Sequence, residues 1–205
     1  MEDPHRDHGV PSRRRPGPAC RRVCQLGLTI AELLTVVAVS AVLLGLGVPA
    51  FSHALVVTRL ASTTNQLLLA AVTARQTAAS LNVPVTFCAG NAAEGCHGQW
   101  PALEWIVFID RDHDGRVDPE DSIRLSERLP DSDDVLLSGN GPFKKAVVFH
   151  PSGAAQTVNG AFAAGRLRIC TTRLGTGNAT DLVLIGSGRF EPEAHDFAGE
   201  CPPAG

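Results

Sequence analysis

The feature that most limits how this chain can fold is an uncharged, mostly apolar stretch of nineteen residues, 33–51, preceded directly by Glu32. A helix needs roughly 20 predominantly apolar residues to cross a bilayer, so this stretch has the length of a membrane span. A chain of 205 residues is long enough for such a helix and one globular domain. The stretch therefore predicts a membrane anchor with a carboxylate at its entrance.

The flanking sequence predicts the orientation and the continuation of this helix. Five arginines lie within residues 13–22, and basic residues mark the cytoplasmic side of a span. A secretory signal peptide is the competing interpretation, but its apolar region is shorter, about 7–15 residues. Here the stretch passes through Pro49 into a helical pattern of apolar positions, namely 56, 60, 67, 71, 74, 78 and 81. We predict one long helix, transmembrane over 28–51 and amphipathic over 52–83, which Asn82 and Pro84 end.

Glu32 is costly at this place. A charge at the centre of a membrane helix costs about 2.5–3.5 kcal/mol on insertion scales, and less near an interface. Glu32 either lies in the headgroup layer without a function or has a cationic partner within the membrane.

After Pro84 the pattern changes to short β-prone segments that Gly, Pro, Asn or Asp separate. The predicted strands are 85–88, 105–109, 122–128, 135–137, 146–149, 167–171 and 182–185. The fold class is therefore α+β, with the amphipathic half of the helix packed on an antiparallel sheet domain over 84–205.

The sequence Gly27-Leu28-Thr29-Ile30-Ala31-Glu32-Leu33 resembles the processing site of type IV prepilins and type II secretion pseudopilins. The resemblance implies that a prepilin peptidase removes residues 1–27 and methylates Leu28, although the usual first residue is Phe. Glu32 then becomes the fifth mature residue and Pro49 the twenty-second, both positions where pilins carry these residue types. It further implies an assembly role, in which Glu32 pairs with the amino terminus of a neighbouring subunit. Such buried pairs are suited to fixing register.

Four body segments, "VPVTFCAGNAAEGCHGQW", "LEWIVFIDRDHDGRVDPEDSIRL", "VVFHPSGAA" and "LRICTT…DLVLIGSGRF", resemble in order the GspH/FimT family of minor pseudopilins. The resemblance implies a type IV pilin-like fold and a structural subunit that initiates or caps a periplasmic pseudopilus, in type II secretion or a type IV pilus. Implied partners are other major and minor pseudopilins or pilins, the prepilin peptidase and the inner-membrane assembly platform. The implied location is the inner membrane, with one span, a cytoplasmic amino terminus and a periplasmic domain.

The six cysteines are divided by the apolar stretch, with Cys20 and Cys24 before it. The four after it are Cys88, Cys96, Cys170 and Cys201. Disulfides form in oxidising compartments, and four cysteines allow three pairings. We expect Cys88–Cys96 across a turn-rich loop and Cys170–Cys201 at the carboxyl end. The alternative, a metal site using Cys96 and His97, fits no zinc spacing well.

The segment "DRDHDGRVDPED" resembles the first half of an EF-hand loop. Asp110, Asp112, Asp114 and the following glycine match its early positions, and Asp121 stands where the closing Glu belongs. Its flanks are predicted strands, and a polar hairpin turn also favours Asp and Gly. Calcium is thus a candidate ligand, and no other metal or cofactor is expected.

Charge is unevenly distributed, since residues 94–134 carry twelve acids and residues 141–190 carry one, Asp181. The basic candidates in this second region are Lys144, Lys145, Arg166, Arg168, Arg173 and Arg189. Such charge suits phosphate contacts. The alternative function is therefore DNA binding for uptake, as in FimT-type relatives, but Glu191 replaces the second Arg of their Gly-Arg-x-Arg segment. No nucleophile motif, phosphate loop or paired-carboxylate pattern is present, so we expect no enzyme.

Overall fold

The computed structural model describes residues 29–130 and 135–205, and its first element is a 52-residue helix, α1 (Ile30–Leu81). The chain divides into two compact units, residues 1–44 and 45–205, and α1 contributes to both. Helix α1 runs without a break through position 49. The prediction of one long helix agrees with this element.

Helix α1 ends where the sequence predicts a stop. Asn82 has φ of 54°, the left-handed conformation that commonly follows a helix, and Asn tolerates it better than most residues. The amide of Val83 donates to the carbonyl of Ala78 at 3.3 Å. This is the bond of a Schellman cap that spans more residues. This cap directs the chain from the helix into the first strand.

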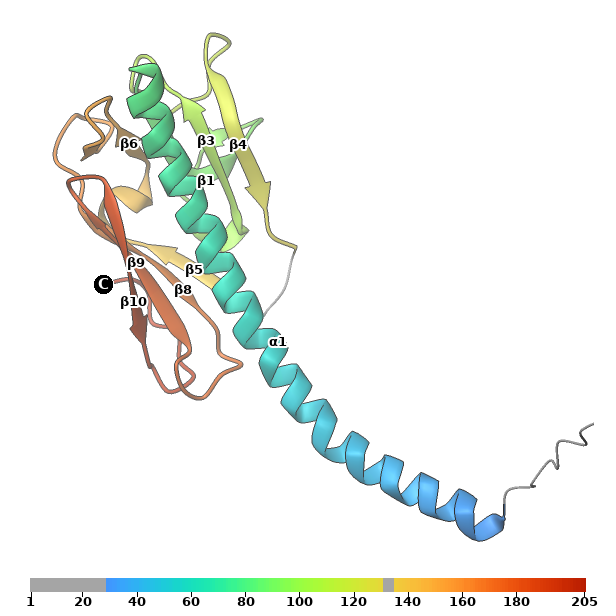
Figure 1. The fold of residues 1–205 in the computed structure, drawn as a ribbon. Helices are drawn as coiled ribbons and strands as arrows, with labels where there is room; N and C mark the ends of the chain where they lie inside the picture. Colours follow the sequence, from blue (N-terminus) through green and yellow to red (C-terminus); the bar gives the residue numbers. More distant parts are fainter. Residues whose placement is uncertain (1–28, 131–134) are drawn as a thin grey trace, which may run out of the picture. The chain divides into compact units, whose positions relative to one another are not determined.

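The body contains two antiparallel sheets, seen beside α1 in Figure 1. The first has the order β4-β3-β1-β6-β7, and β2 pairs with β1. The second has the order β10-β9-β8-β5. The strands of the first sheet are β1 (Val85–Asn91), β2 (Gly95–Cys96), β3 (Glu104–Ile109), β4 (Ser122–Arg128), β6 (Val147–Phe149) and β7 (Ala155–Gln156). Those of the second are β5 (Leu136–Gly139), β8 (Gly165–Cys170), β9 (Ala179–Ile185) and β10 (Arg189–His195).

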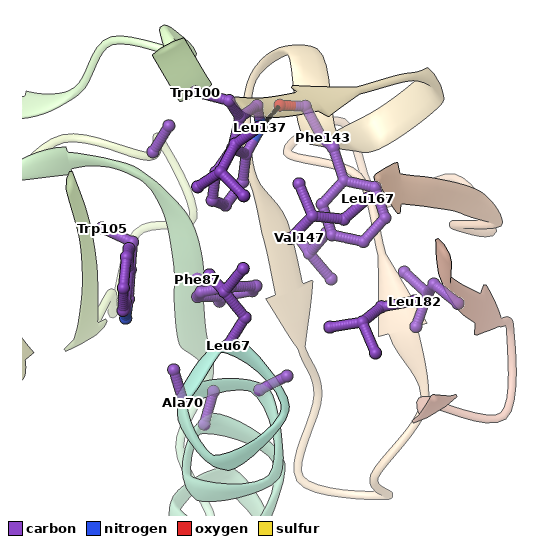
Figure 2. Close-up of a cluster of buried hydrophobic side chains, with 14 of the residues drawn as sticks. Leu67, Ala70, Phe87, Trp100, Trp105, Leu137, Phe143, Val147, Leu167 and Leu182 are labelled. Atoms are coloured by element: carbon purple, nitrogen blue, oxygen red, sulfur yellow. Dashed lines mark hydrogen bonds between the residues drawn. The ribbon is translucent and has the colours of Figure 1, made fainter. Parts of the chain in front are cut away.

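Small residues on α1 allow the helix to approach both sheets closely. Four alanines of this face are completely buried, namely Ala70, Ala71, Ala74 and Ala78. Leu67 lies among them and shares one core with Phe87 of the first sheet and Leu182 of the second, as Figure 2 shows. Aromatic side chains fill the space further from the helix. Large buried apolar side chains stabilise a domain by about 1.5–3 kcal/mol each, so this core holds the body together.

Trp100 brings a polar group into this core and satisfies it. It lies in the short helix η1 (Trp100–Ala102), and its Nε1 donates to the carbonyl of Phe143 at 2.7 Å. Phe143 belongs to a second short helix, η2 (Gly141–Lys144). A buried indole N–H needs such a partner, and this bond links the two short helices that lie between strands.

The predicted fold class is confirmed, since a long helix packs on antiparallel sheets. Every predicted strand overlaps an observed one, and 122–128 agrees at both ends. Three observed strands, β2, β7 and β10, were not predicted. Two of them have only two residues each. Strand β10 contains Pro192 and has an ionisable side chain at every second position.

Candidate functional site

The amino-terminal end of α1 has a reciprocal cap between Thr29 and Glu32. The amide of Glu32 donates to Thr29 Oγ1 at 3.2 Å, and the amide of Thr29 donates to Glu32 Oε2 at 3.4 Å. This is a capping box, which satisfies two of the amides that have no partner at a helix start. A negative charge here also interacts favourably with the helix dipole. Glu32 therefore has a structural role within its own chain.

The rest of the predicted membrane segment is helical with exposed apolar side chains. Val36, Leu43 and Leu44 are 60%, 66% and 65% exposed. Within the described residues, α1 is the one helix long and apolar enough to cross a membrane, judged by length and composition. Position 49 is helical, but the side chain of Pro49 lies outside what the structure describes, as do Gly27 and Leu28.

Arg168 and Asp181 form a buried ion pair at directly opposed positions of β8 and β9. Nε and Nη2 of Arg168 donate to Oδ1 and Oδ2 of Asp181 at 2.7 and 2.8 Å. Nη1 donates to the carbonyls of Pro202 and Pro203, each at 3.0 Å, and the guanidinium lies 4.4 Å from the Phe197 ring centre. Because this guanidinium is buried and engaged on all sides, its prediction as a DNA contact is wrong.

The pKa of Asp181 reflects the same pair. Burial alone would raise the pKa of this carboxyl, because a charge loses its hydration. The hydrogen bonds and charge of Arg168, with the charges of His195 and Arg166, outweigh burial and hold the pKa below its ordinary value. Asp181 is therefore ionised and compensated.

The partly exposed Arg166 and the exposed Arg189 of the same sheet also have acidic neighbours. Arg166 Nη1 lies 3.6 Å from Asp181 Oδ2 and 3.6 Å from Glu193 Oε2. Arg189 Nη2 lies 3.8 Å from Glu191 Oε1. The register places these residues on one face, since Arg166 opposes Val183, and Val183 opposes Glu191. This face mixes both signs of charge, which weakens its attraction for a polyanion.

Lys144 and Lys145 lie in a different setting. Both are exposed, and they line a shallow pocket together with Asp114 and Arg116. The lysines therefore lie beside the acidic loop. The basic candidates consequently divide into a charge-mixed sheet face and a lysine pair next to carboxylates.

The acidic loop connects β3 to β4, as predicted, and brings three of its carboxylates together. One oxygen each of Asp110, Asp112 and Asp114 lies within 4.8 Å of the others. Asp110 is fully buried, whereas Asp112 and Asp114 are exposed. Asp121 turns back within the loop, where its Oδ2 accepts from the amide of Asp118 at 3.1 Å.

The four cysteines of the body form two disulfides in the structure. Cys88–Cys96 links β1 to β2, with Cα atoms 5.6 Å apart. Cys170–Cys201 links the end of β8 to the carboxyl-terminal segment, with Cα atoms 5.8 Å apart. Cys96 is therefore not a metal ligand, and its neighbour His97 contacts Glu104 at 2.9 Å. These are the two pairings expected from the sequence.

Comparison with known proteins places this arrangement in a family. A family model described as "Type II transport protein GspH" matches residues 63–188, more than half of the 205 residues. The chain belongs to the GspH family. The resemblance inferred from the sequence is thereby confirmed, and with it a pseudopilin or minor-pilin type of protein, a structural class rather than a typical enzyme class.

Solved structures similar to this GspH-family chain include the type IV minor pilin FimU of Pseudomonas aeruginosa strain PAO1 in two crystal forms. In one form the identity is 15%, with 72% of this chain and 95% of FimU covered, and the TM-score is 0.48. In the other the identity is 17%, the coverage is 70% and 97%, and the TM-score is 0.44. No curated protein sequence matches the chain significantly.

The GspH match includes the acidic loop and the Arg168–Asp181 pair, but not Glu32 or Cys201. Asp181 and Asn178 are structural residues that the sequence analysis did not assign. Asn178 Nδ2 donates to the carbonyl of Glu200 at 2.8 Å, and its Oδ1 accepts from the amide of Phe197 at 2.8 Å. The one available signal was the isolation of Asp181 among basic residues, which suggests a paired carboxylate.

Proposed function

We propose that this GspH-family chain is a minor pseudopilin that helps to initiate or cap a periplasmic pseudopilus, in a type II secretion system or a type IV pilus. The observation that carries the proposal is α1. Its first part presents uncharged apolar side chains, and its later part supplies a buried face to the body. A subunit built this way can anchor in a membrane and then pack its exposed helix against neighbouring subunits.

Processing and topology follow from the sequence around this helix. The prepilin peptidase cleaves after Gly27 and methylates Leu28, and the helix then anchors the chain in the inner membrane. The arginines of residues 13–22 remain cytoplasmic, and the body is periplasmic. The two disulfides of the body support an oxidising compartment.

Glu32 contributes to assembly through its charge. After cleavage, the amino group of Leu28 on a neighbouring subunit is a cation that can reach into the apolar layer. A hydrogen bond between charged groups contributes about 1.5–3 kcal/mol, which corresponds to about tenfold or more in incorporation.

The capping box makes it possible to separate the charge of Glu32 from its structural role. Gln at this position of a capping box keeps the reciprocal bonds and removes the charge. We expect Glu32→Gln to insert in the membrane but to enter filaments about tenfold less than wild type, and Glu32→Ala to behave likewise. Thr29→Ala is the matched control, because it removes the hydroxyl cap and keeps the carboxylate.

The measurement is the amount of each variant recovered with assembled pseudopili, relative to the amount in the membrane. Mass spectrometry of the same membrane protein should give an amino terminus at methylated Leu28. Equal recovery of Glu32→Gln and wild type would exclude the charge as the assembly determinant. An intact 1–27 segment in cells with an active prepilin peptidase would exclude a pseudopilin.

A further inference from the structure

The acidic loop, residues 110–121, carries more carboxylates than its own structure uses. Its aspartates are Asp110, Asp112, Asp114, Asp118 and Asp121. The internal bonds of the loop occupy one oxygen each of several of them. Asp112 Oδ1 accepts from the amide of Asp114 at 3.4 Å, and Asp114 Oδ1 accepts from the amide of Arg116 at 2.7 Å. These bonds leave a second oxygen on each side chain for another ligand.

Asp110 provides an independent sign of a missing partner. Its side chain is fully buried, and Oδ2 accepts from Thr86 Oγ1 at 2.6 Å and from the amide of Gly115 at 3.1 Å. Oδ1 is also buried and has no hydrogen-bond partner in the part of the chain that the structure describes. A buried carboxylate oxygen without a partner is costly, and most such atoms in proteins bind a donor, water or an ion.

The charges around Asp110 point to a cation as that partner. One oxygen each of Asp110, Asp112 and Asp114 lies within 4.8 Å of the others, so three carboxylates meet at one place. The carboxylates of the loop therefore repel one another, and a divalent cation would relieve this repulsion.

The nearby basic side chains do not replace such a cation. Arg116 is 83% exposed, and its Nε lies 3.9 Å from Asp114 Oδ2. Arg111 donates to the backbone carbonyl of Glu120 at 3.3 Å. Lys144 and Lys145 are exposed and line a pocket with Asp114. None of these contacts involves the buried oxygen of Asp110.

We propose that the acidic loop is a calcium site in which Asp110 Oδ1 and the free oxygens of Asp112 and Asp114 bind the ion, with Asp118 and Asp121 completing its negative surroundings. All of these donors are oxygens, which favours Ca²⁺ or Mg²⁺ over metals that prefer nitrogen or sulfur. The number of carboxylates in a loop without regular structure favours Ca²⁺, because Mg²⁺ demands a near-octahedral shell and retains waters. Val117 anchors the loop by packing against the buried cluster of Cys88, Ile106, Phe108 and Ala146. The site does not depend on the assembly proposal.

The test is calcium titration of the full chain, purified in detergent and freed of divalent cations, by isothermal titration calorimetry. We expect one saturable event with a Kd on the order of 10⁻⁴ to 10⁻³ M, the range of extracellular calcium modules, and a higher Tm in calcium. The same titration with magnesium should bind at least about tenfold more weakly.

Asp112→Asn and Asp114→Asn should each weaken calcium binding by about tenfold or more, because each removes a charged ligand. Both side chains are exposed, so the fold should persist, and far-UV circular dichroism verifies this. Asp196→Asn is the matched control. Asp196 accepts the same kind of turn bond, from the amide two residues later at 2.9 Å, but lies outside the loop. The calcium affinity of Asp196→Asn should therefore stay within about twofold of wild type. The proposal would be overturned if no saturable heat appeared up to 10 mM calcium, or if both loop variants bound calcium as wild type does. Equal affinity for magnesium would overturn the choice of calcium as the ion.

Discussion

Asp110 and Asp181 are both fully buried aspartates of the β-sheet body, but their surroundings differ. Asp181 receives two hydrogen bonds from Arg168 and also lies 3.4 Å from His195 Nε2 and 3.6 Å from Arg166 Nη1. Asp110 receives its bonds from neutral donors and leaves one oxygen without a partner among the described residues. The pKa is accordingly lowered at Asp181 and raised at Asp110.

The difference shows that burial alone does not determine what a carboxylate contributes. At Asp181 the protein itself supplies the compensating cation, so the charge becomes part of the fold. At Asp110 the carboxylate stands at the start of a loop of further acids, so its charge opposes folding unless a cation is added. The same substitution at the two positions should therefore have opposite effects on stability.

The largest effect is expected for Asp181→Asn. Loss of one partner of a buried ion pair costs about 3–5 kcal/mol, and because Asn still accepts one hydrogen bond we expect about 3 kcal/mol. The free energy of unfolding is measured by urea titration of the full chain in detergent, followed by fluorescence of the buried Trp100 and Trp105. Glu193→Gln is the control on the same sheet face, and its exposed side chain should change stability by less than about 0.5 kcal/mol. A cost below about 1 kcal/mol at Asp181 would mean that Arg168 is compensated from elsewhere.

An intermediate effect with the opposite sign is expected for Asp110→Asn. In chelator at pH 7 this change should raise the free energy of unfolding by about 1 kcal/mol, because it removes a buried charge and keeps an acceptor for Thr86 and Gly115. The same urea titration measures it.

The pH dependence of this gain has a defined sign. Since the folded pKa of Asp110 is raised, the folded wild type takes up a proton before the unfolded chain does. The penalty in wild type therefore disappears as pH falls through the raised pKa toward about 3.9, the unfolded value. The stability difference between Asp110→Asn and wild type should shrink over that window. A difference that is constant or grows toward pH 4 would contradict the assignment of the effect to the Asp110 charge.

The smallest effects are expected on the exposed part of the charge-mixed face. Arg189→Ala should change stability by less than about 0.5 kcal/mol, since Arg189 and Glu191 form an exposed pair. DNA binding should be weak at physiological salt, with a small salt slope, because few phosphates can be contacted. Glu191→Arg should strengthen it, and mobility shifts over a salt series measure both. Submicromolar binding at about 150 mM salt would make DNA uptake the better function.

The extent of sequence-based prediction differs between parts of the fold. Strand 122–128 and the end of the helix at Asn82 follow from local pattern and were predicted closely. Strand β10 was missed because it contains Pro192, a residue that argues against a strand in the sequence. A proline is tolerated there since β10 is an edge strand.

The candidate sites show the same division. The acidic loop was predicted because its aspartates are close in sequence. Arg168 was misassigned because its burial depends on its register with Asp181, thirteen residues away, and on the carboxyl-terminal segment. The isolation of Asp181 among basic residues suggests a paired carboxylate, but it does not identify Arg168 as the partner.

The capping box at the start of α1 has a consequence for the proposed assembly. Because Thr29 already donates to Glu32, a neighbouring amine would join or displace an existing donor rather than meet a bare charge. In the proposed assembly, the net gain of docking is then the charged interaction less the weaker amide bond, and a departing subunit recovers that amide bond. A subunit of the proposed assembly could therefore leave its neighbour without exposing a carboxylate that has no donor.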